Sequence, residues 1–203
     1  MTFGIIPACG HSTRMGCPKL SLPLGDRTVI EHVVRALLGG GVKVVLVVAG
    51  PHVPALEPLA MRAGARVLTL SERPPDMRAT VEAGLDWLES HFRPAADDWW
   101  LLAPGDHPTL TPATVRTLLD AARADAEYSI FVPVWDGRRG HPLVASWRHA
   151  DGVRATPRGE GVNSYLKRTP DAVREVGVTD SGGLHDLDTT DDYDRLLRRI
   201  PNK

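Results

Sequence analysis

The segment at residues 42–49 constrains the fold most, because it is apolar and β-branched almost throughout. Such a strand is covered on both faces, as inside a parallel sheet. Another apolar run, at residues 3–8, precedes it. Between the two, a helical stripe of apolar residues begins at Thr28 and stops at the three glycines 39–41, a helix stop signal. Strand, helix and strand in this order form one βαβ unit.

The same alternation continues down the chain. Helices are predicted at residues 53–63, at 78–88 and from Thr111 onward, and strands at 66–70, 99–103 and 129–134. Repeated alternation of this kind predicts an α/β protein with a doubly wound, mostly parallel sheet of the Rossmann-like type.

The regular alternation of strands and helices ends in the last third of the chain. A short strand at residues 143–145 and a helix at 162–168 lie among glycine, arginine and proline residues, and predict a small cap or an antiparallel edge of the sheet. A strand at 173–176 and an amphipathic helix at 190–200 complete the pattern. At this length we expect one compact domain, residues 1–203.

Composition and charge exclude several classes of protein. The formal net charge is −1, so the chain has no overall attraction for nucleic acid or an anionic membrane. No apolar run approaches the roughly 20 residues that span a bilayer, and the apolar start lacks a basic leader. Cys9 and Cys17 cannot supply a disulfide framework or a four-ligand zinc site. We expect a cytoplasmic protein that binds neither nucleic acid nor membrane.

The loop after the first strand, residues 7–19, has the composition of an anion-binding site. Gly10 lets backbone amides approach a phosphate, Ser12 adds a hydroxyl donor, and Arg14 and Lys19 supply two cations. The loop is neither a P-loop nor the glycine pattern of dinucleotide-binding folds. Because ligands of open α/β sheets bind beyond the carboxyl ends of the strands, the loop predicts a triphosphate site. The structural alternative is a glycine-rich turn with two solvated cations.

Carboxylates occur at two later places where metal could bind. Asp106 follows the predicted strand at 99–103, and Asp186 and Asp188 alternate along an extended segment near the end of the chain, so that both point to one side. Mg²⁺ prefers one or two carboxylates together with phosphate oxygens and water. These aspartates are therefore candidate metal ligands, although Asp106 could instead form an Asx turn before a helix.

A third group of residues suits a phosphorylated substrate. Arg139, Gly140 and His141 lie in a glycine-rich segment after a predicted strand. Arginine binds phosphate in bidentate fashion, and histidine can act as an acid or a base near neutral pH, although a structural histidine fits equally well. Thr80 lies near the start of a predicted helix, whose N-terminus would attract phosphate.

Together these segments resemble, in the same order along the chain, the nucleotidyltransferases that attach CMP or GMP to molybdopterin, in particular the molybdenum cofactor cytidylyltransferase branch of the MobA-like NTP transferases. Residues 8–19 are similar to the signature Ala-Ala-Gly-x-Ser-x-Arg-Met-Gly-x-x-Lys, and residues 105–108 to Gly-Asp-x-Pro. Residues 137–142 resemble Gly-x-x-Gly-His-Pro. Residues 186–192 resemble Asp-Ile-Asp-Thr-Pro-Asp-Asp, with Thr190 in place of proline.

The resemblance implies an enzyme that uses Mg²⁺ and whose first loop wraps a nucleoside triphosphate. It assigns nucleotide contacts to Ala8, Cys9, Gly10, Ser12, Arg14, Lys19 and Thr80. It assigns catalysis to Arg14, Lys19 and Asp106, Mg²⁺ binding to Asp106 and Asp188 with Asp186 as the alternative, and acceptor binding to Arg139, Gly140 and His141.

Cys9 bears on the choice of donor, because it departs from the family pattern. The family has alanine or glycine at this position, which faces the base; glycine resembles the guanine-using branch and alanine the cytosine-using branch. Cysteine is closer to alanine in bulk. We therefore expect CTP in preference to GTP, and transfer of CMP to the phosphate of molybdopterin with release of pyrophosphate.

The sequence leaves three alternatives. The chain could be a guanylyltransferase that uses GTP, or a cytidylyltransferase for another phosphorylated metabolite, such as a sugar or polyol phosphate. It could also be a non-catalytic module that holds a pterin cofactor for delivery. A molybdoenzyme or its chaperone is the expected protein partner.

Overall fold

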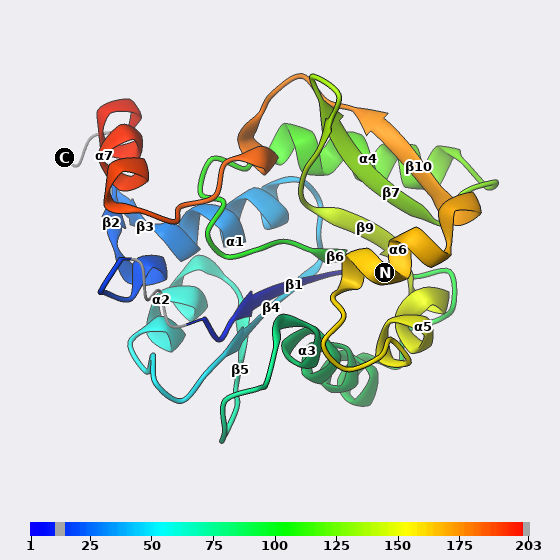
Figure 1. Cartoon of the computed structure of the whole chain (residues 1–203), viewed down its shortest axis with the longest axis horizontal. Coiled ribbons are helices and arrows are strands. Elements are labelled where there is room, and N and C mark those ends of the chain that lie inside the picture. Colours follow the sequence, from blue (N-terminus) through cyan, green and yellow to red (C-terminus); the bar gives the residue numbers. More distant parts are fainter. Residues whose placement is uncertain (11–14, 201–203) are drawn as a thin grey trace.

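The computed structural model describes residues 1–10 and 15–200 as an α/β fold built on one twisted main sheet (Figure 1). The strands of this sheet are β1 (Thr2–Ala8), β4 (Val44–Ala49), β5 (Arg66–Thr69), β6 (Trp99–Leu102), β7 (Ile130–Trp135), β8 (Arg138–Arg139), β9 (Leu143–Ser146) and β10 (Val173–Gly177). The helices are α1 (Val29–Gly39), α2 (Leu56–Ala63), α3 (Met77–Phe92), α4 (Pro112–Ala124), α5 (Ala150–Arg154), α6 (Val162–Arg168) and α7 (Thr190–Arg199). A two-stranded hairpin, β2 (Pro23–Leu24) and β3 (Arg27–Thr28), lies apart.

The strand order of the main sheet is β10-β7-β9-β6-β1-β4-β5, with β8 paired to β7. Strand β1 is parallel to both of its neighbours, β4 and β6. Strand β9 is antiparallel to β6 on one side and to β7 on the other, which leaves β7 parallel to β6. The mostly parallel α/β sheet predicted from the sequence is confirmed.

The position of β9 differs from the prediction. The sequence placed this strand in a cap or at an antiparallel edge, whereas the structure places it between β6 and β7, with all four of its residues buried. Four residues, Leu143–Ser146, are enough because β6 is equally short and pairs with β9 along its whole length. The antiparallel strand thus lies inside the sheet, and the loop that precedes it reaches the carboxyl end of β6.

Helices cover both faces of the sheet, and the side chains of β1 show how. Ile6 points toward a core shared with α1, α2 and α4, whereas Phe3 and Ile5 point toward a core shared with α3, α5 and α6. Figure 1 shows α1 and α4 on one side of the sheet and α3 with α5 on the other. This alternation is what a strand covered on both faces requires.

A smaller third core joins the two ends of the chain. Leu24 and Val29, from the region of the β2–β3 hairpin, pack against Leu187 and Leu196 from the C-terminal segment. Helix α7 therefore lies beside the hairpin (Figure 1). Its Leu196 packs in the same core as Leu20 and Leu22, which follow the first loop. None of the described helices has the length and apolar composition that crossing a bilayer requires.

Candidate active site

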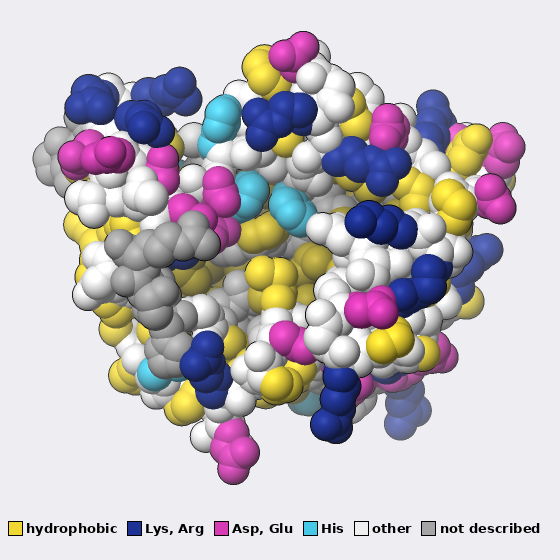
Figure 2. Space-filling view, in the orientation of Figure 1, with side chains coloured by type: hydrophobic (Ala, Val, Ile, Leu, Met, Phe, Trp, Pro, Cys, Tyr) yellow, Lys and Arg dark blue, Asp and Glu magenta, His cyan; other side chains and the backbone are white. Residues whose placement is uncertain are grey.

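A pocket of about 310 Å³ lies beyond the carboxyl ends of β1 and β6. It is lined by four segments that are distant in sequence: residues 7–10 with Lys19 and Leu20, residues 73–77 with Thr80, residues 104–106, and Asp188. Figure 2 shows a hollow near the centre of one face of the molecule, with histidine and acidic side chains gathered beside it. The volume is that of a small-ligand site, and its place agrees with the general rule for open α/β sheets.

Lys19 and two aspartates form the charged part of this pocket. The Nζ atom of Lys19 donates to Oδ2 of Asp106 at 2.7 Å and to Oδ1 of Asp188 at 2.9 Å. All three side chains are partly buried, with exposed fractions of 15%, 23% and 29% in that order. Burial alone would lower the pKa of Lys19, but the hydrogen bonds and charges of Asp106 and Asp188 outweigh burial and raise it. Lys19 is therefore fully charged at neutral pH.

Asp188 reaches this position because the C-terminal segment is fixed to the loop after β6. The backbone N–H of Leu187 donates to the carbonyl of Asp106 at 2.8 Å, and the Leu187 side chain is fully buried. Asp188 follows directly and turns its carboxylate toward Lys19. Asp186, on the other side of Leu187, is exposed, and its charge acts on His107 and His141 instead.

Two glycines, Gly182 and Gly183, let this segment pass between two loops. The backbone N–H of His141 donates to the carbonyl of Gly183 at 2.8 Å, and Oγ1 of Thr109 donates to the carbonyl of Gly182 at 3.1 Å. A Cβ atom at Gly183 would lie 1.9 Å from the His141 carbonyl oxygen, and one at Gly182 would lie 2.1 Å from that of Thr109. Only glycine fits such a close approach of two backbones.

No motif in the sequence pointed to these glycines or to Asp180, whose carboxylate accepts from the N–H of Gly182. The carboxylate of Asp180 accepts hydrogen bonds from Oγ1 of Thr111, the N-cap of α4, at 2.9 Å and from Oγ1 of Thr114, in its first turn, at 2.8 Å. The sequence feature that marks these residues is a pair of glycines in a turn that begins with an aspartate, a pattern that is also common in exposed surface loops. Its close contacts are with residues about 40 to 75 positions earlier, so spacing alone could not reveal them.

The carboxylates fit a divalent metal of the hard type. Oxygens of Asp106 and Asp188 converge on a single nitrogen at hydrogen-bond distance, so both can reach one cation. The described residues contain no group of three or more histidines, cysteines and acids that could hold a metal by themselves. A site with two carboxylates suits Mg²⁺, which completes its shell with phosphate oxygens and water.

Two histidines, the buried His107 and the partly buried His141, lie beside the carboxylates. The rings of His107 and His141 meet edge to face, with centroids 5.3 Å apart, and Nδ1 of each is buried without a hydrogen-bond partner. Burial, followed by the charge of His107, lowers the pKa of His141 to about 4. Burial also lowers the pKa of His107. Both shifts favour the neutral ring near pH 7, in which form His141 can donate or accept a hydrogen bond, and its role in acid–base chemistry stays a prediction.

The residues expected to contact nucleotide divide into two groups. Ala8, Cys9, Gly10, Lys19 and Thr80 line the pocket. Cys9 is buried, its Sγ donates to the carbonyl of Val48 at 3.4 Å, and burial raises the pKa of its thiol, so it packs as a neutral side chain. Ser12 and Arg14 lie outside the described residues.

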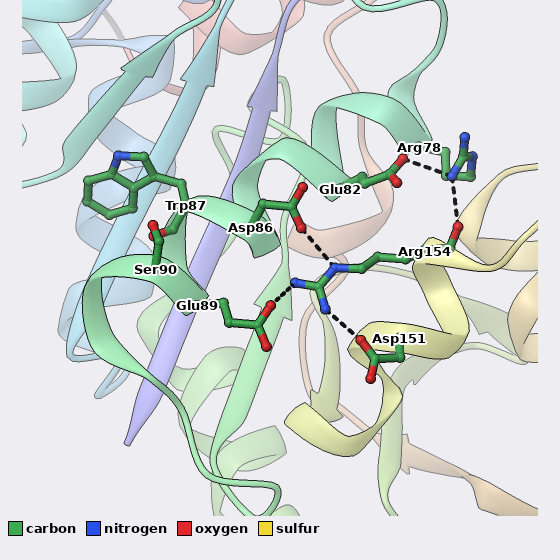
Figure 3. A network of polar contacts seen from close by, with 8 residues as sticks. All are labelled: Arg78, Glu82, Asp86, Trp87, Glu89, Ser90, Asp151 and Arg154. Atoms are coloured by element: carbon green, nitrogen blue, oxygen red, sulfur yellow. Dashed lines mark hydrogen bonds and ion pairs between the residues drawn. The ribbon is translucent and has the colours of Figure 1, made fainter.

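The start of α3 is not an open phosphate site. The carboxylate of Asp76 caps the helix by accepting from the N–H of Ala79 at 2.8 Å, which places a negative charge where a phosphate would bind. Arg78, next to it in sequence, turns toward α5 and donates to Glu82 at 3.0 Å and to the carbonyl of Arg154 at 3.2 Å (Figure 3). The cap thus competes with a phosphate at this helix end, and the nucleotide contact expected of Thr80 stays a prediction.

The three acceptor candidates also separate. A Cβ atom at Gly140 would lie 2.8 Å from the carbonyl oxygen of Gly183, so Gly140 is required for close packing, and His141 lies beside His107. Arg139, however, donates to Glu175 on β10 at 2.7 Å and is half exposed. The structure thus places His141 beside His107, next to Asp106, and packs Gly140 against Gly183. Neither residue lines the pocket, and the Arg139 side chain is directed to the edge strand β10.

Sequence relatives of this chain include enzymes of two kinds. It is 29% identical over 202 residues to nicotine blue oxidoreductase of Paenarthrobacter nicotinovorans, covering 96% of this chain and 95% of that protein. It is 30% identical over 167 residues to 2-C-methyl-D-erythritol 4-phosphate cytidylyltransferase of Ralstonia nicotianae, covering 77% and 64%. A probable molybdenum cofactor guanylyltransferase of Bacillus mycoides is 26% identical over 156 residues, covering 72% and 68%.

Solved structures and a family model agree on the class. A nucleotidyl transferase from Methanothermobacter superposes with a TM-score of 0.76 at 26% identity, covering 98% of this chain and 99% of that one. Rv0371c of Mycobacterium tuberculosis in complex with manganese gives 0.76 at 26% identity, covering 97% of each chain. The model of the MobA-like NTP transferase domain matches residues 4–173. The chain therefore belongs to the MobA-like NTP transferase family and is a nucleotidyltransferase.

Proposed function

We propose that this nucleotidyltransferase uses Mg²⁺ to transfer CMP from CTP to the phosphate of molybdopterin, with release of pyrophosphate. The observation that carries the proposal is the convergence of Asp106 and Asp188 on Lys19 inside the pocket at the exit of β1. Two carboxylates and a cation at one point provide what a triphosphate and its metal need. Gly10, in the first loop, lines the same pocket and would offer its backbone amide to a phosphate.

The reaction needs placement and charge control more than a strong base. An oxygen of the acceptor phosphate attacks the α-phosphorus in line; the new P–O bond forms as the bond to the bridging oxygen breaks and pyrophosphate leaves. Asp106 and Asp188 would hold Mg²⁺, which supplies charge neutralisation at the α-phosphate. Lys19, together with Arg14, would offset the charge that develops on the pyrophosphate. His141, being neutral, would donate a hydrogen bond to the acceptor without moving a proton.

Cys9 supports the choice of CTP. Its side chain lies in the pocket lining close to Thr80, and its hydrogen bond to Val48 keeps it against the sheet, where it takes up room that glycine would leave free. A pyrimidine needs less room than a purine. The test is pyrophosphate release with CTP and with GTP, comparing the wild type with Cys9→Gly. We expect a preference for CTP that shrinks in Cys9→Gly; preference for GTP in the wild type would contradict the donor assignment.

Molybdopterin as acceptor is supported by the family and by the guanylyltransferase relative that acts on molybdenum cofactor. The same pocket would suit another phosphorylated metabolite, as in the relative that acts on 2-C-methyl-D-erythritol 4-phosphate. Incubation with CTP and each acceptor in turn distinguishes them. Pyrophosphate should be released from CTP at a rate proportional to the enzyme concentration only when the true acceptor is present. A molybdoenzyme or its chaperone would then receive the product, and we expect the chain to act in the cytoplasm.

A redox activity is the second candidate, because the similarity to nicotine blue oxidoreductase extends over nearly the whole of both chains. Such a reaction would transfer electrons to an oxidised acceptor, and a reduced nicotinamide is the electron donor chosen to test for it. Loss of absorbance at the nicotinamide band measures it directly. We expect no acceptor-dependent loss, and we expect nucleotidyl transfer to stop when Mg²⁺ is removed by a chelator.

A further inference from the structure

The ammonium group of Lys19 lies where the two carboxylates meet. Its Nζ atom is 2.7 Å from an oxygen of Asp106 and 2.9 Å from an oxygen of Asp188, and only 15% of the lysine side chain is exposed. In such a partly buried place, charges act on one another more strongly than in bulk water. The lysine therefore neutralises one of the two negative charges that would otherwise repel each other.

The same carboxylates are those that the proposed function assigns to the metal. An ammonium and a divalent cation cannot both lie within contact distance of these two aspartates without strong mutual repulsion. If metal is to bind both, Lys19 must release at least one of them. Lysine carries a compact charge on a flexible four-carbon stem, which suits it to change partners by side-chain rotation.

The surroundings show which of these groups are anchored by the fold. Asp188 is fixed by its neighbour Leu187. The backbone N–H of Leu187 donates to the carbonyl of Asp106, and its side chain is buried in the small core with Leu24, Val29 and Leu196. Leu20 and Leu22, which follow Lys19, pack against that same core and hold the backbone of the lysine. The carboxylates and the main chain are thus anchored, and the side chain of Lys19 is the part that can exchange.

We infer that Lys19 and the divalent cation compete for Asp106 and Asp188, and that the triphosphate ends the competition by offering Lys19 its phosphates instead. This inference rests on the proposed function, since it takes the pocket to bind a nucleoside triphosphate with its metal. Its consequence is that metal binds weakly alone and tightly with nucleotide. The lysine thereby couples the assembly of the metal site to the arrival of substrate, in addition to its contact with phosphate.

The experiment measures Mn²⁺ binding to the full chain without nucleotide, by the electron paramagnetic resonance signal of free Mn²⁺. Lys19→Met removes the charge and keeps the stem. We expect it to bind Mn²⁺ at least about tenfold more tightly than the wild type, because a competing cation is gone. Lys43→Met is the matched control: Lys43 is exposed and precedes β4, at the opposite end of the strands, and this variant should bind as the wild type does.

A second readout covers the case in which Lys19→Met folds poorly. Two carboxylates left without their cation repel each other and lower the stability of the fold, and a bound metal ion should restore that stability. Lys19→Gln, which keeps a polar end, should therefore gain more in melting temperature from Mn²⁺ than the wild type or Lys43→Met. Equal gains in all variants, or no tighter binding in either Lys19 variant, would overturn the inference.

A nucleotide arm tests the coupling. Equilibrium dialysis measures Mn²⁺ binding in the presence and absence of CTP, and a chamber without protein gives the background from Mn²⁺–CTP itself. The wild type should bind Mn²⁺ more tightly with CTP than without it. The increase in Mn²⁺ affinity on adding CTP should be smaller in Lys19→Met. Equal gains would contradict the coupling. Pyrophosphate release by the wild type is measured separately. If the Lys19 variants bind Mn²⁺ more tightly but no nucleotide is turned over, the competition stands and the proposed function fails.

Discussion

At the scale of single residues, Asp106 is the residue on which most of the proposed chemistry depends. Its carboxylate follows β6, pairs with Lys19 and lies beside His107. The sequence identified it, with Lys19 and Asp188, because fixed motifs carry these residues at fixed spacing. The choice of Asp188 over Asp186 could not be made from sequence. Alternation in an extended segment puts Asp186 and Asp188 on one side. In the structure the hydrogen bond from Leu187 N–H to the Asp106 carbonyl fixes the segment so that Asp188 reaches Lys19 and Asp186 is exposed.

Asp106→Asn should reduce turnover by about a hundredfold or more, because the neutral amide binds metal poorly and leaves the developing charge less well stabilised. The measurement is pyrophosphate release at saturating Mg²⁺ and nucleotide. Asp191→Asn is the control, since Asp191 is exposed in the first turn of α7 and lines no part of the pocket. Urea unfolding of both variants checks the fold. Near-normal turnover in Asp106→Asn would contradict the role given to this aspartate.

At the scale of elements, helix starts were predictable because capping is local. Thr111 and Pro112 open α4 as predicted, with Oγ1 of Thr111 accepting from the N–H of Thr114 at 3.2 Å. Thr28 opens α1 in a capping box with Glu31. The position of β9 was not predictable, since insertion between β6 and β7 depends on contacts across the sheet that no local pattern encodes. The β2–β3 hairpin was missed because each strand has only two residues.

Glu31 at the start of α1 gives a prediction for pH. Its carboxylate accepts from Thr28 N at 2.7 Å and from Arg62 Nε at 2.9 Å, and the residue is 5% exposed. Burial alone would raise its pKa, but the hydrogen bonds from Arg62 and Thr28 outweigh burial and lower it. A carboxyl with a lowered folded-state pKa stabilises the fold above its unfolded pKa of about 4.3, and this stability is lost as pH falls through the folded pKa.

Glu31→Gln should therefore reduce the free energy of unfolding at pH 7 by about 1 kcal/mol, within the range of a lost helix cap. The difference from the wild type should shrink as the pH is lowered below about 4. Urea unfolding at pH 7 and at pH 3 measures both values. A difference that grows toward low pH would show that the charge of Glu31 is not the source of its contribution.

Helices α3 and α5 are joined by Arg154, which donates to Asp86 at 2.9 Å, Glu89 at 2.6 Å and Asp151 at 2.7 Å (Figure 3). Arg154→Met should lower the free energy of unfolding by about 1 kcal/mol or less, because the three carboxylates are well exposed and such pairs are screened by water. Arg154→Lys should not restore it fully, since a single ammonium cannot bind three carboxylates as a planar fork does. Melting temperatures at low and high salt measure the effect, which should be smaller at high salt.

At the scale of the whole molecule, the site exists because the end of the chain returns to its beginning. Residues 180–188 bind the first turn of α4, the loop before β9 and the loop after β6 in succession, and α7 then packs beside the β2–β3 hairpin. Sequence motifs could name the residues at both ends of this path. They could not show that the path is closed by backbone contacts at Gly182 and Gly183, because these contacts involve no side chain that a motif would record.

Gly183→Ala tests that closure. The new Cβ would lie 1.9 Å from the carbonyl oxygen of His141, so the segment must move away and carry Asp188 away from Asp106. We expect turnover to fall by at least about tenfold, together with weaker Mn²⁺ binding, because one carboxylate leaves the site. Gly177→Ala at the end of β10 is the matched control, since its Cβ would meet nothing within 4 Å. If both variants behave alike, the closure of the chain at Gly183 does not set the distance between the two carboxylates.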